Sequence, residues 1–246
     1  MIDVKIKAMP FVVIAMIAVL LLGVRPVHAQ KKAGMSIGDF SKDNIEYPVK
    51  FSLISDLEIG WCNVLNPDYS LYPNDNDFMK LKVGPSTNIS LGVAEVSFRI
   101  IRGFYFKIGA RIDWYNYVFS NQITLVDDGV MIQPSAITDA TDFKKSKLST
   151  TYIGIPIRLV LGSSRNISFG VEGSASYLVE SHTKYKSPVK KNKGIEHLNE
   201  LQLMAGATIS FKGIGVYGRY AFSPMFRNNE GPAGCNGLYF GICLGL

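Results

Sequence analysis

Histidines and cysteines are the residues of this 246-residue chain that could most directly carry out chemistry. Beyond the N-terminal region there are two histidines, His182 and His197, and neither belongs to a recognisable motif with a serine and an aspartate. The cysteines, Cys62, Cys235 and Cys243, lack the spacing of a zinc site. We therefore expect solvated loop histidines, no metal, no cofactor and no enzymatic activity. Cys62 and Cys235 could pair if the first and last strands are neighbours, and free thiols are the alternative.

A larger set of charged residues is spaced for a different role. Its seven acids and six bases fall in seven of eight segments, mostly on the same side of an alternating pattern. The members are Lys50, Asp56, Glu58, Glu95, Arg99, Lys107, Arg111, Asp113, Arg158, Glu172, Glu180, Glu200 and Arg219. An eight-stranded barrel is only just wide enough for side chains to fill. We therefore expect these charges to pair across a lumen and close it, with a proton or ion path as the alternative.

The segments that must position these charges alternate apolar residues with small or polar ones, which is the period of a strand with two unlike faces. In the third segment, Ile108 and Ile112 share one parity, and Lys107, Arg111 and Asp113 share the other. A bulge near Ala94 is needed to keep the second segment in register, and Pro156 predicts a local break in the fourth. We expect strands at about 48–61, 88–101, 104–119, 149–162, 166–181, 198–212, 214–224 and 238–246.

The connections between these segments alternate strictly between short and long. Tight turns are expected at 102–103, 163–166 and 212–213, and long loops near 62–87, 120–148, 182–197 and 225–237. This alternation is typical of outer-membrane barrels and favours them over a soluble, lipocalin-like barrel with an apolar cavity. In the second long loop, ITLVDDGVMI predicts a hairpin. In the third, the lysine-rich run 184–193 is interpreted as a solvated loop.

The N-terminus has the pattern of a secretory signal peptide. Lys5 and Lys7 precede an apolar run, and Val27-His28-Ala29 has small residues at the cleavage positions. We expect a signal peptide at 1–29, a periplasmic segment at 30–47 and an outer-membrane barrel at 48–246. A retained anchor is disfavoured because the run is shorter than the roughly 20 apolar residues that span a bilayer. Cleavage would reduce the net charge from +6 to +4, and without a clustered basic stripe we do not expect nucleic acid as a partner.

Several stretches, MKLKVGPSTNISL, GARIDWYNYVF, SKLSTTYIGIPIRLVL and YGRYAFSPMFRNNEGP, are similar to the PorT-like outer-membrane β-barrel family of the Bacteroidota. The resemblance covers nearly all of the mature chain. The patterns from Tyr152 to Ile157 and from Tyr220 to Phe226 are its more specific parts. It implies an outer-membrane barrel and carries no activity.

The sequence thus predicts an all-β protein, an eight-stranded antiparallel up-and-down transmembrane β-barrel that is monomeric and plugged. Its expected partners are outer-membrane lipid and, through the long loops, an extracellular ligand or envelope protein. A structural or surface-binding role in the envelope is the expected function. A secretion or assembly factor and, less favoured, an enzyme with a site at the barrel rim are the alternatives.

Overall fold

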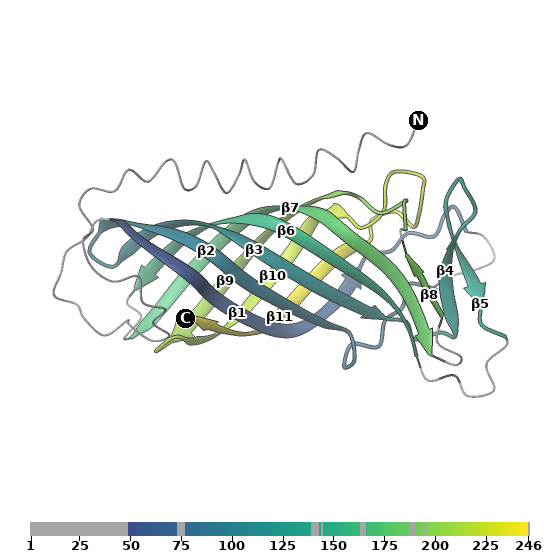
Figure 1. Ribbon diagram of the computed structural model, residues 1–246, viewed down its shortest axis with the longest axis horizontal. Coiled ribbons are helices and arrows are strands. Elements are labelled where there is room, and N and C mark those ends of the chain that lie inside the picture. The colour runs from purple at the N-terminus through teal and green to yellow at the C-terminus, as the bar shows by residue number, and fades with distance from the viewer. Residues whose placement is uncertain are drawn as a thin grey trace. The chain divides into compact units, whose positions relative to one another are not determined.

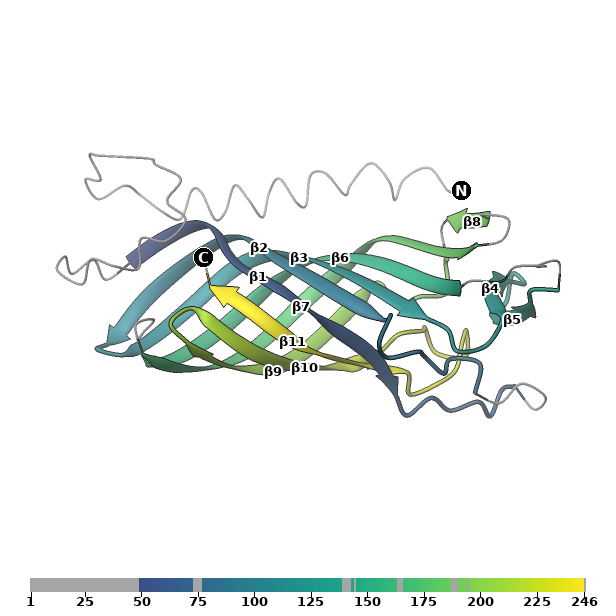
Figure 2. The same cartoon turned by 90° about the horizontal axis from the view of Figure 1, so that it is seen from below.

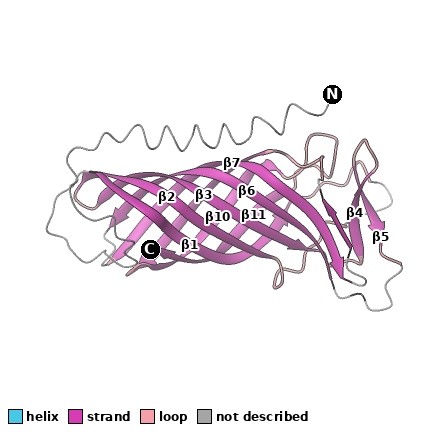
Figure 3. Cartoon of the chain, viewed as in Figure 1, coloured by secondary structure: helices cyan, strands magenta, loops and turns pink. Residues whose placement is uncertain are grey.

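The computed structural model describes residues 49–72, 77–138, 143, 145–162, 166–186, 190–193 and 195–245. The expected signal peptide and periplasmic segment lie outside these residues. The strands are β1 (Val49–Leu65), β2 (Thr87–Ile101), β3 (Phe104–Val118), β4 (Ile123–Asp127), β5 (Ile132–Ala136), β6 (Lys145–Gly162), β7 (Ile167–Lys186), β8 (Lys190–Lys193), β9 (Leu201–Phe211), β10 (Ile214–Pro224) and β11 (Asn236–Gly245). The described residues form strands, turns and loops (Figure 3). None of the described segments is a helix long and apolar enough to cross a bilayer.

Eight of these strands close into an antiparallel ring (Figure 1). Its order is β1, β2, β3, β6, β7, β9, β10 and β11, and β11 returns to pair with β1 from Asp56↔Gly245 to Leu65↔Asn236. The expected up-and-down β-barrel of eight strands is therefore confirmed. The hairpin of β4 and β5 lies beyond the end of the barrel opposite to that where β11 ends (Figures 1 and 2).

The short turns at 102–103 and 212–213 form where the sequence predicts them, and the turn expected at 163–166 lies mostly outside the described residues. Lys212 and Gly213 join β9 to β10, and both have positive φ, 52° and 83°. Two positive φ values make a turn whose twist matches that of the flanking strands. Glycine adopts this conformation without a steric penalty, which explains its place at the second turn position.

Three strands extend further toward the long loops than predicted. β1 ends at Leu65 rather than residue 61, β6 begins at Lys145 rather than residue 149, and β7 continues to Lys186 rather than ending at residue 181. In the added parts of β6 and β7 the outward positions are polar, so the apolar alternation that marks a strand is missing. For the same reason the interpretation of run 184–193 as a solvated loop was wrong, because its described residues belong to β7 and β8.

Both predicted irregularities occur. The pairing of β2 with β3 shifts register between Gly92 and Ala94, which confirms the bulge. Along β3 and β6 the paired positions pass from Ile108↔Ile157 to Arg111↔Gly154, so the ladder is interrupted opposite Pro156 without a change of register. Proline lacks the N–H that this ladder needs. On its other side, β6 stays continuously paired with β7 through Pro156↔Ser174.

The barrel wall is apolar on its outer surface. Each ring strand presents at least one large exposed hydrophobic side chain: Ile59, Ile89, Trp114, Ile157, Phe169, Ile209, Val216 and Ile242. Residues of the opposite parity are buried, and they include Arg111, Asp113 and Glu172. The polar face is therefore inside the ring and the apolar face outside, which is the reverse of a soluble barrel.

Candidate functional site

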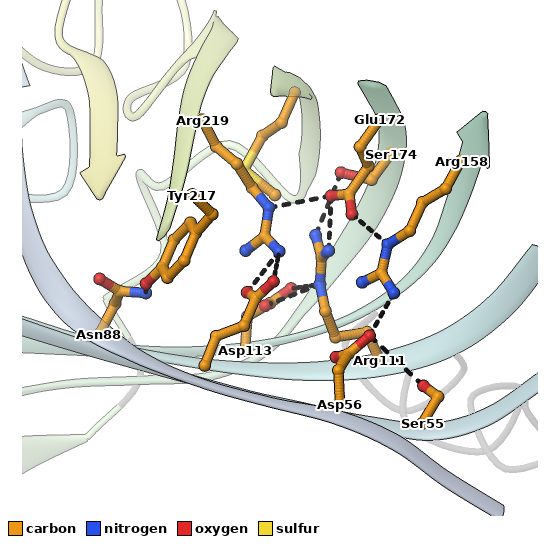
Figure 4. A network of polar contacts seen from close by, with 12 residues as sticks. Ser55, Asp56, Asn88, Arg111, Asp113, Arg158, Glu172, Ser174, Tyr217 and Arg219 are labelled. Atoms are coloured by element: carbon orange, nitrogen blue, oxygen red, sulfur yellow. Dashed lines mark hydrogen bonds and ion pairs between the residues drawn. The ribbon is translucent and has the colours of Figure 1, made fainter. Parts of the chain in front are cut away.

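A network of charged side chains fills the middle of the barrel, and Glu172 of β7 is its centre (Figure 4). One carboxylate oxygen of Glu172 accepts from Arg111 Nη1 at 2.5 Å and from Arg219 Nε at 2.9 Å. The other accepts from Arg158 Nε at 2.6 Å. Three arginines from β3, β6 and β10 thus converge on one carboxylate, and a buried carboxylate of this kind stays charged because its partners compensate the loss of water.

The network continues outward from the three arginines. Arg158 also binds Asp56 of β1, and it lies 3.2 Å from Glu95 Oε2. Glu95 in turn accepts from Lys107 Nζ at 2.7 Å. Arg111 binds its neighbour Asp113 at 2.9 Å, and Arg219 binds Glu58 of β1. The ion pairs cross the lumen in several directions, so the network ties together six of the eight ring strands.

Nine of the thirteen predicted lumen residues are joined in this network: Asp56, Glu58, Glu95, Lys107, Arg111, Asp113, Arg158, Glu172 and Arg219. The other four were wrongly included. Lys50, Arg99 and Glu180 are exposed, and Glu200 is bound at the rim to Arg227 and Tyr177. Lys50, Arg99 and Glu200 lie near the ends of their strands or just beyond them, where alternation no longer separates the inside of a closed barrel from its surroundings. Glu180 lies inside β7, next to a register shift against β6 that changes which parity faces outward.

A layer of tyrosines fills the lumen on the side of the long loops. Tyr115 stacks on Tyr239 with ring centroids 4.4 Å apart, and the hydroxyls of Tyr117 and Tyr239 are 3.0 Å apart. Gln202 Nε2 donates to the same Tyr239 hydroxyl at 2.9 Å. Tyr115 has the same parity along its strand as Arg111 and Asp113, but the sequence gives no sign that these tyrosines form a joined layer. The charged network and the tyrosines together leave a filled interior.

The long loops fold over the mouth of the barrel as a cap, which we define as described residues 66–86, 119–138 and 195–235 outside the ring strands. Tyr72, Phe78, Leu125, Ile132 and Phe226 are buried there in one apolar cluster that continues into the lumen. The loops pack together because their apolar residues are hidden only when the loops lie against one another.

Backbone and hydroxyl hydrogen bonds join the cap loops. The Tyr72 hydroxyl donates to the carbonyl of Ile132 at 2.6 Å, and the N–H of Ile132 donates to the carbonyl of Glu230 at 2.9 Å. Asp68 and Ala233 exchange two backbone hydrogen bonds of 2.8 and 3.0 Å. The first, second and fourth long loops are thereby connected to one another. The third joins them through Arg227, whose N–H donates to the His197 carbonyl at 3.0 Å.

His197 lies between two carboxylates in this cap. Its Nε2 is 2.6 Å from Asp127 Oδ1 on the β4–β5 hairpin, and its Nδ1 is 3.0 Å from Glu230 Oε2. The expectation of a solvated loop histidine was wrong for His197, which is buried. It was also wrong for His182, which lies in β7 close to Glu180. Sequence could not associate His197 with Asp127 because 70 residues separate them.

Two carboxylates can only accept hydrogen bonds, so both ring nitrogens of His197 must donate, and only imidazolium has two N–H groups. Burial lowers the pKa of His197, but the hydrogen bonds to Asp127 and Glu230 outweigh it and raise that pKa above its ordinary value. The hydrogen bond from His197, followed by that from the N–H of Gly129, lowers the pKa of Asp127. The cluster is therefore a charged clamp between the hairpin and the other cap loops.

The cysteines are free and buried. Cys62 does not meet Cys235, although β1 and β11 pair, because the residue opposite Cys62 is Tyr239. Among the described residues no group of three or more histidine, cysteine or carboxylate side chains is arranged to hold a metal ion.

Comparisons with known proteins add little to this description. No family model and no curated protein matches the sequence. Among solved structures, one mutant of the Rh. blastica porin aligns over 80% of this chain and 100% of its own, with 12% identity and a TM-score of 0.19. A second mutant of the same porin gives 12% identity and a TM-score of 0.20 over the same shares. These scores are too low to support an argument, so the fold assignment rests on the strand ring itself.

Proposed function

We propose that this protein is a monomeric integral outer-membrane β-barrel with a plugged lumen, which serves the envelope as a structural or surface-binding protein. The apolar outer wall carries the proposal. A soluble barrel would expose its polar face to water, whereas this one turns nine ionic side chains inward, seven of them buried, and exposes isoleucine, phenylalanine and tryptophan all around the ring. A lipid environment is the solvent that suits such a wall.

The filled lumen argues against a pore function. Arg111, Asp113 and Glu172 are buried within the barrel, and Tyr115 and Tyr239 stack between them and the cap. A path for water or solutes would require these side chains to separate, and breaking buried ion pairs is strongly unfavourable. We therefore assign the activity to the outer surfaces of the barrel and cap.

The cap supports a binding role more than a catalytic one. Both ring nitrogens of His197 contact carboxylates, so the ring does not activate a hydroxyl or thiol nucleophile in this arrangement. Because hydrogen bonds join its loops, the cap presents a fixed surface, and a preformed surface loses less conformational entropy when a partner binds. The resemblance to PorT-like barrels agrees with this proposal and does not name the partner.

Cell fractionation tests the proposal. We expect mature protein, beginning near Gln30, in the outer-membrane fraction, and a change in its gel mobility on boiling, as for barrels that stay folded in detergent. A soluble periplasmic protein would refute the proposal.

A further inference from the structure

The β4–β5 hairpin lies against the rest of the cap through one of its two faces. It forms a two-stranded sheet of its own beyond the end of the ring (Figures 1 and 2). Leu125 of β4 and Ile132 of β5 are fully buried, whereas Val126 and Val130 are exposed. The hairpin therefore covers a surface of the other cap loops with apolar side chains.

Ile132 lies on that surface as a residue of a bound peptide would. Its N–H donates to the carbonyl of Glu230 at 2.9 Å, and its carbonyl accepts from the Tyr72 hydroxyl at 2.6 Å. Its side chain is buried in the apolar cluster of the cap. Extended peptides are commonly recognised by this combination of main-chain hydrogen bonds and a buried side chain. The cap thus holds a segment of its own chain in the manner of a ligand.

The surface beneath Ile132 is aromatic. The ring centroid of Phe78 lies 5.1 Å from that of Tyr69 and 5.0 Å from that of Tyr72, and Phe226 is buried in the same cluster. We call these four side chains, together with the carbonyl of Glu230, the aromatic floor. Its rings provide apolar contact, and the Tyr72 hydroxyl and the Glu230 carbonyl provide one hydrogen-bond donor and one acceptor.

A group of polar contacts that fastens the hairpin to the other loops meets at one cross-strand pair. Asp127 of β4 is directly opposite Ile132 of β5. Asp127 Oδ1 lies 2.6 Å from His197 Nε2, beside the two main-chain hydrogen bonds of Ile132. The first and fourth long loops, which carry the aromatic floor, are also joined by the two backbone hydrogen bonds between Asp68 and Ala233. These bonds do not involve the hairpin, so the floor stays joined when the hairpin is released.

We propose that the aromatic floor is a docking site for an extended polypeptide segment with a β-branched apolar residue, and that the hairpin is a lid whose Ile132 occupies this site in the free protein. The apolar residue of the partner replaces Ile132, with its N–H on the Glu230 carbonyl and its carbonyl on the Tyr72 hydroxyl. A peptide suits the floor better than a wholly apolar molecule, because both of these polar groups need a partner when they are buried. This inference deepens the proposed function and rests on it, because it takes the cap as the binding surface.

The test titrates the whole mature protein in uncharged detergent with a fluorescently labelled peptide, VMIQPSA, which copies residues 130–136. Ile132→Asp should release the lid, because it places a carboxylate in an apolar site directly opposite Asp127. The matched control is Ser135→Asp, which adds the same charge at an exposed position of β5. A tethered lid competes at an effective concentration of about millimolar, so Ile132→Asp should bind the peptide at least ~10-fold more tightly than the wild type or the control.

Two further variants make the test specific to the lid and the floor. His197→Gln weakens the attachment of Asp127 without changing the apolar face of the hairpin, and it too should bind the peptide more tightly than the wild type. Adding Tyr72→Phe to Ile132→Asp removes the hydroxyl that holds the peptide carbonyl, and it should weaken binding again. Gel mobility before and after boiling checks that each variant is folded.

Three outcomes would overturn the inference: peptide binding by the folded lid variants no tighter than by the wild type, equal binding of a peptide with aspartate in place of its isoleucine, or unchanged affinity when Tyr72→Phe is added. Cell fractionation is a separate experiment. An outer-membrane protein whose peptide binding ignores the lid disproves only this inference, whereas a periplasmic protein disproves the proposed function.

Discussion

Arg111 Nη1 donates to Glu172 Oε1 at 2.5 Å, although 61 residues separate the two along the chain. Both side chains are buried, and the same carboxylate also binds Arg158 and Arg219. One acidic residue therefore holds three cations, of which Arg111 and Arg219 are buried. The interior of the barrel should depend on it far more than on any ion pair at the rim.

Replacing Glu172 tests this dependence. We expect Glu172→Gln to lower the free energy of unfolding by about 3–5 kcal/mol, because it leaves buried cations without their counter-charge. The matched control is Glu200→Gln, which removes a partly exposed carboxylate at the rim and should change stability by less than ~1 kcal/mol. Reversible unfolding in detergent or lipid measures both. Equal losses in the two variants would mean that the interior network does not stabilise the barrel.

The outer wall gives a second prediction. Ile157 is 44% exposed and lies in the middle part of the barrel wall, opposite Ile108. Ile157→Arg should destabilise the protein in lipid by about 2–4 kcal/mol, the cost of a cation at the bilayer midplane. Val130→Arg, at the exposed tip of the β4–β5 hairpin, should have little effect. If Ile157→Arg were as harmless as Val130→Arg, the wall would face water.

The ring could be predicted from sequence because in a barrel wall the two faces meet different surroundings. Ile108 and Ile112 on one parity, with Arg111 and Asp113 on the other, indicate both the strand and its orientation. The alternation of apolar and polar residues ends before Lys145 and Lys147, which lie in the part of β6 nearest the long loops, because neither face of the strand has to be apolar there. The predicted ends of β6 and β7 were therefore wrong.

The interior site could be predicted as a set of residues and not as a geometry. Parity selected Glu172 correctly, but Arg111 of β3 and Arg219 of β10 are on strands that do not pair with β7, so these contacts form only across the lumen of the closed ring. The contacts of His197 with Asp127 and Glu230 could not be predicted from the sequence for the same reason. They join the second, third and fourth long loops, and no local pattern links Asp127 to Glu230.

The clamp gives a prediction about pH. The pKa of His197 is raised above 6.5 in the folded protein, so its stabilising charge is complete below that pH and is lost as the pH rises through the raised value. The pKa of Asp127 is lowered, so its contribution is lost only as the pH falls through that lowered value. The β4–β5 hairpin should therefore be held best in mildly acidic solution and should loosen above neutrality.

A nitroxide attached at Val130→Cys would report this loosening, since Val130 is 73% exposed at the hairpin tip and the native cysteines are buried. We expect probe mobility to increase as the pH is raised from below 6.5 through the raised pKa of His197, where the imidazolium loses its charge. In His197→Gln the response should vanish, whereas His182→Gln should retain it. A response that is unchanged in His197→Gln would assign the pH dependence to another group.

The filled lumen gives a prediction about permeability. Purified protein inserted into planar bilayers should show no large, persistent conductance, because the charged network and the stacked pair of Tyr115 and Tyr239 occupy the lumen. A general porin prepared in the same way is the positive control for insertion. A stable, porin-sized channel would show that the interior opens in a membrane.

Lipid contact at the wall is the central claim, and the two tryptophans of the chain test it most directly. Trp61 and Trp114 point outward from β1 and β3 and are 40% and 36% exposed. Tryptophan prefers the membrane interface, and both residues lie toward the long-loop ends of their strands. In bilayers of brominated lipids, we predict strong quenching of their fluorescence when bromine is near the headgroup, and little quenching by iodide in the water. Quenching by iodide with none by brominated lipid would contradict the account, because the apolar wall would then face water.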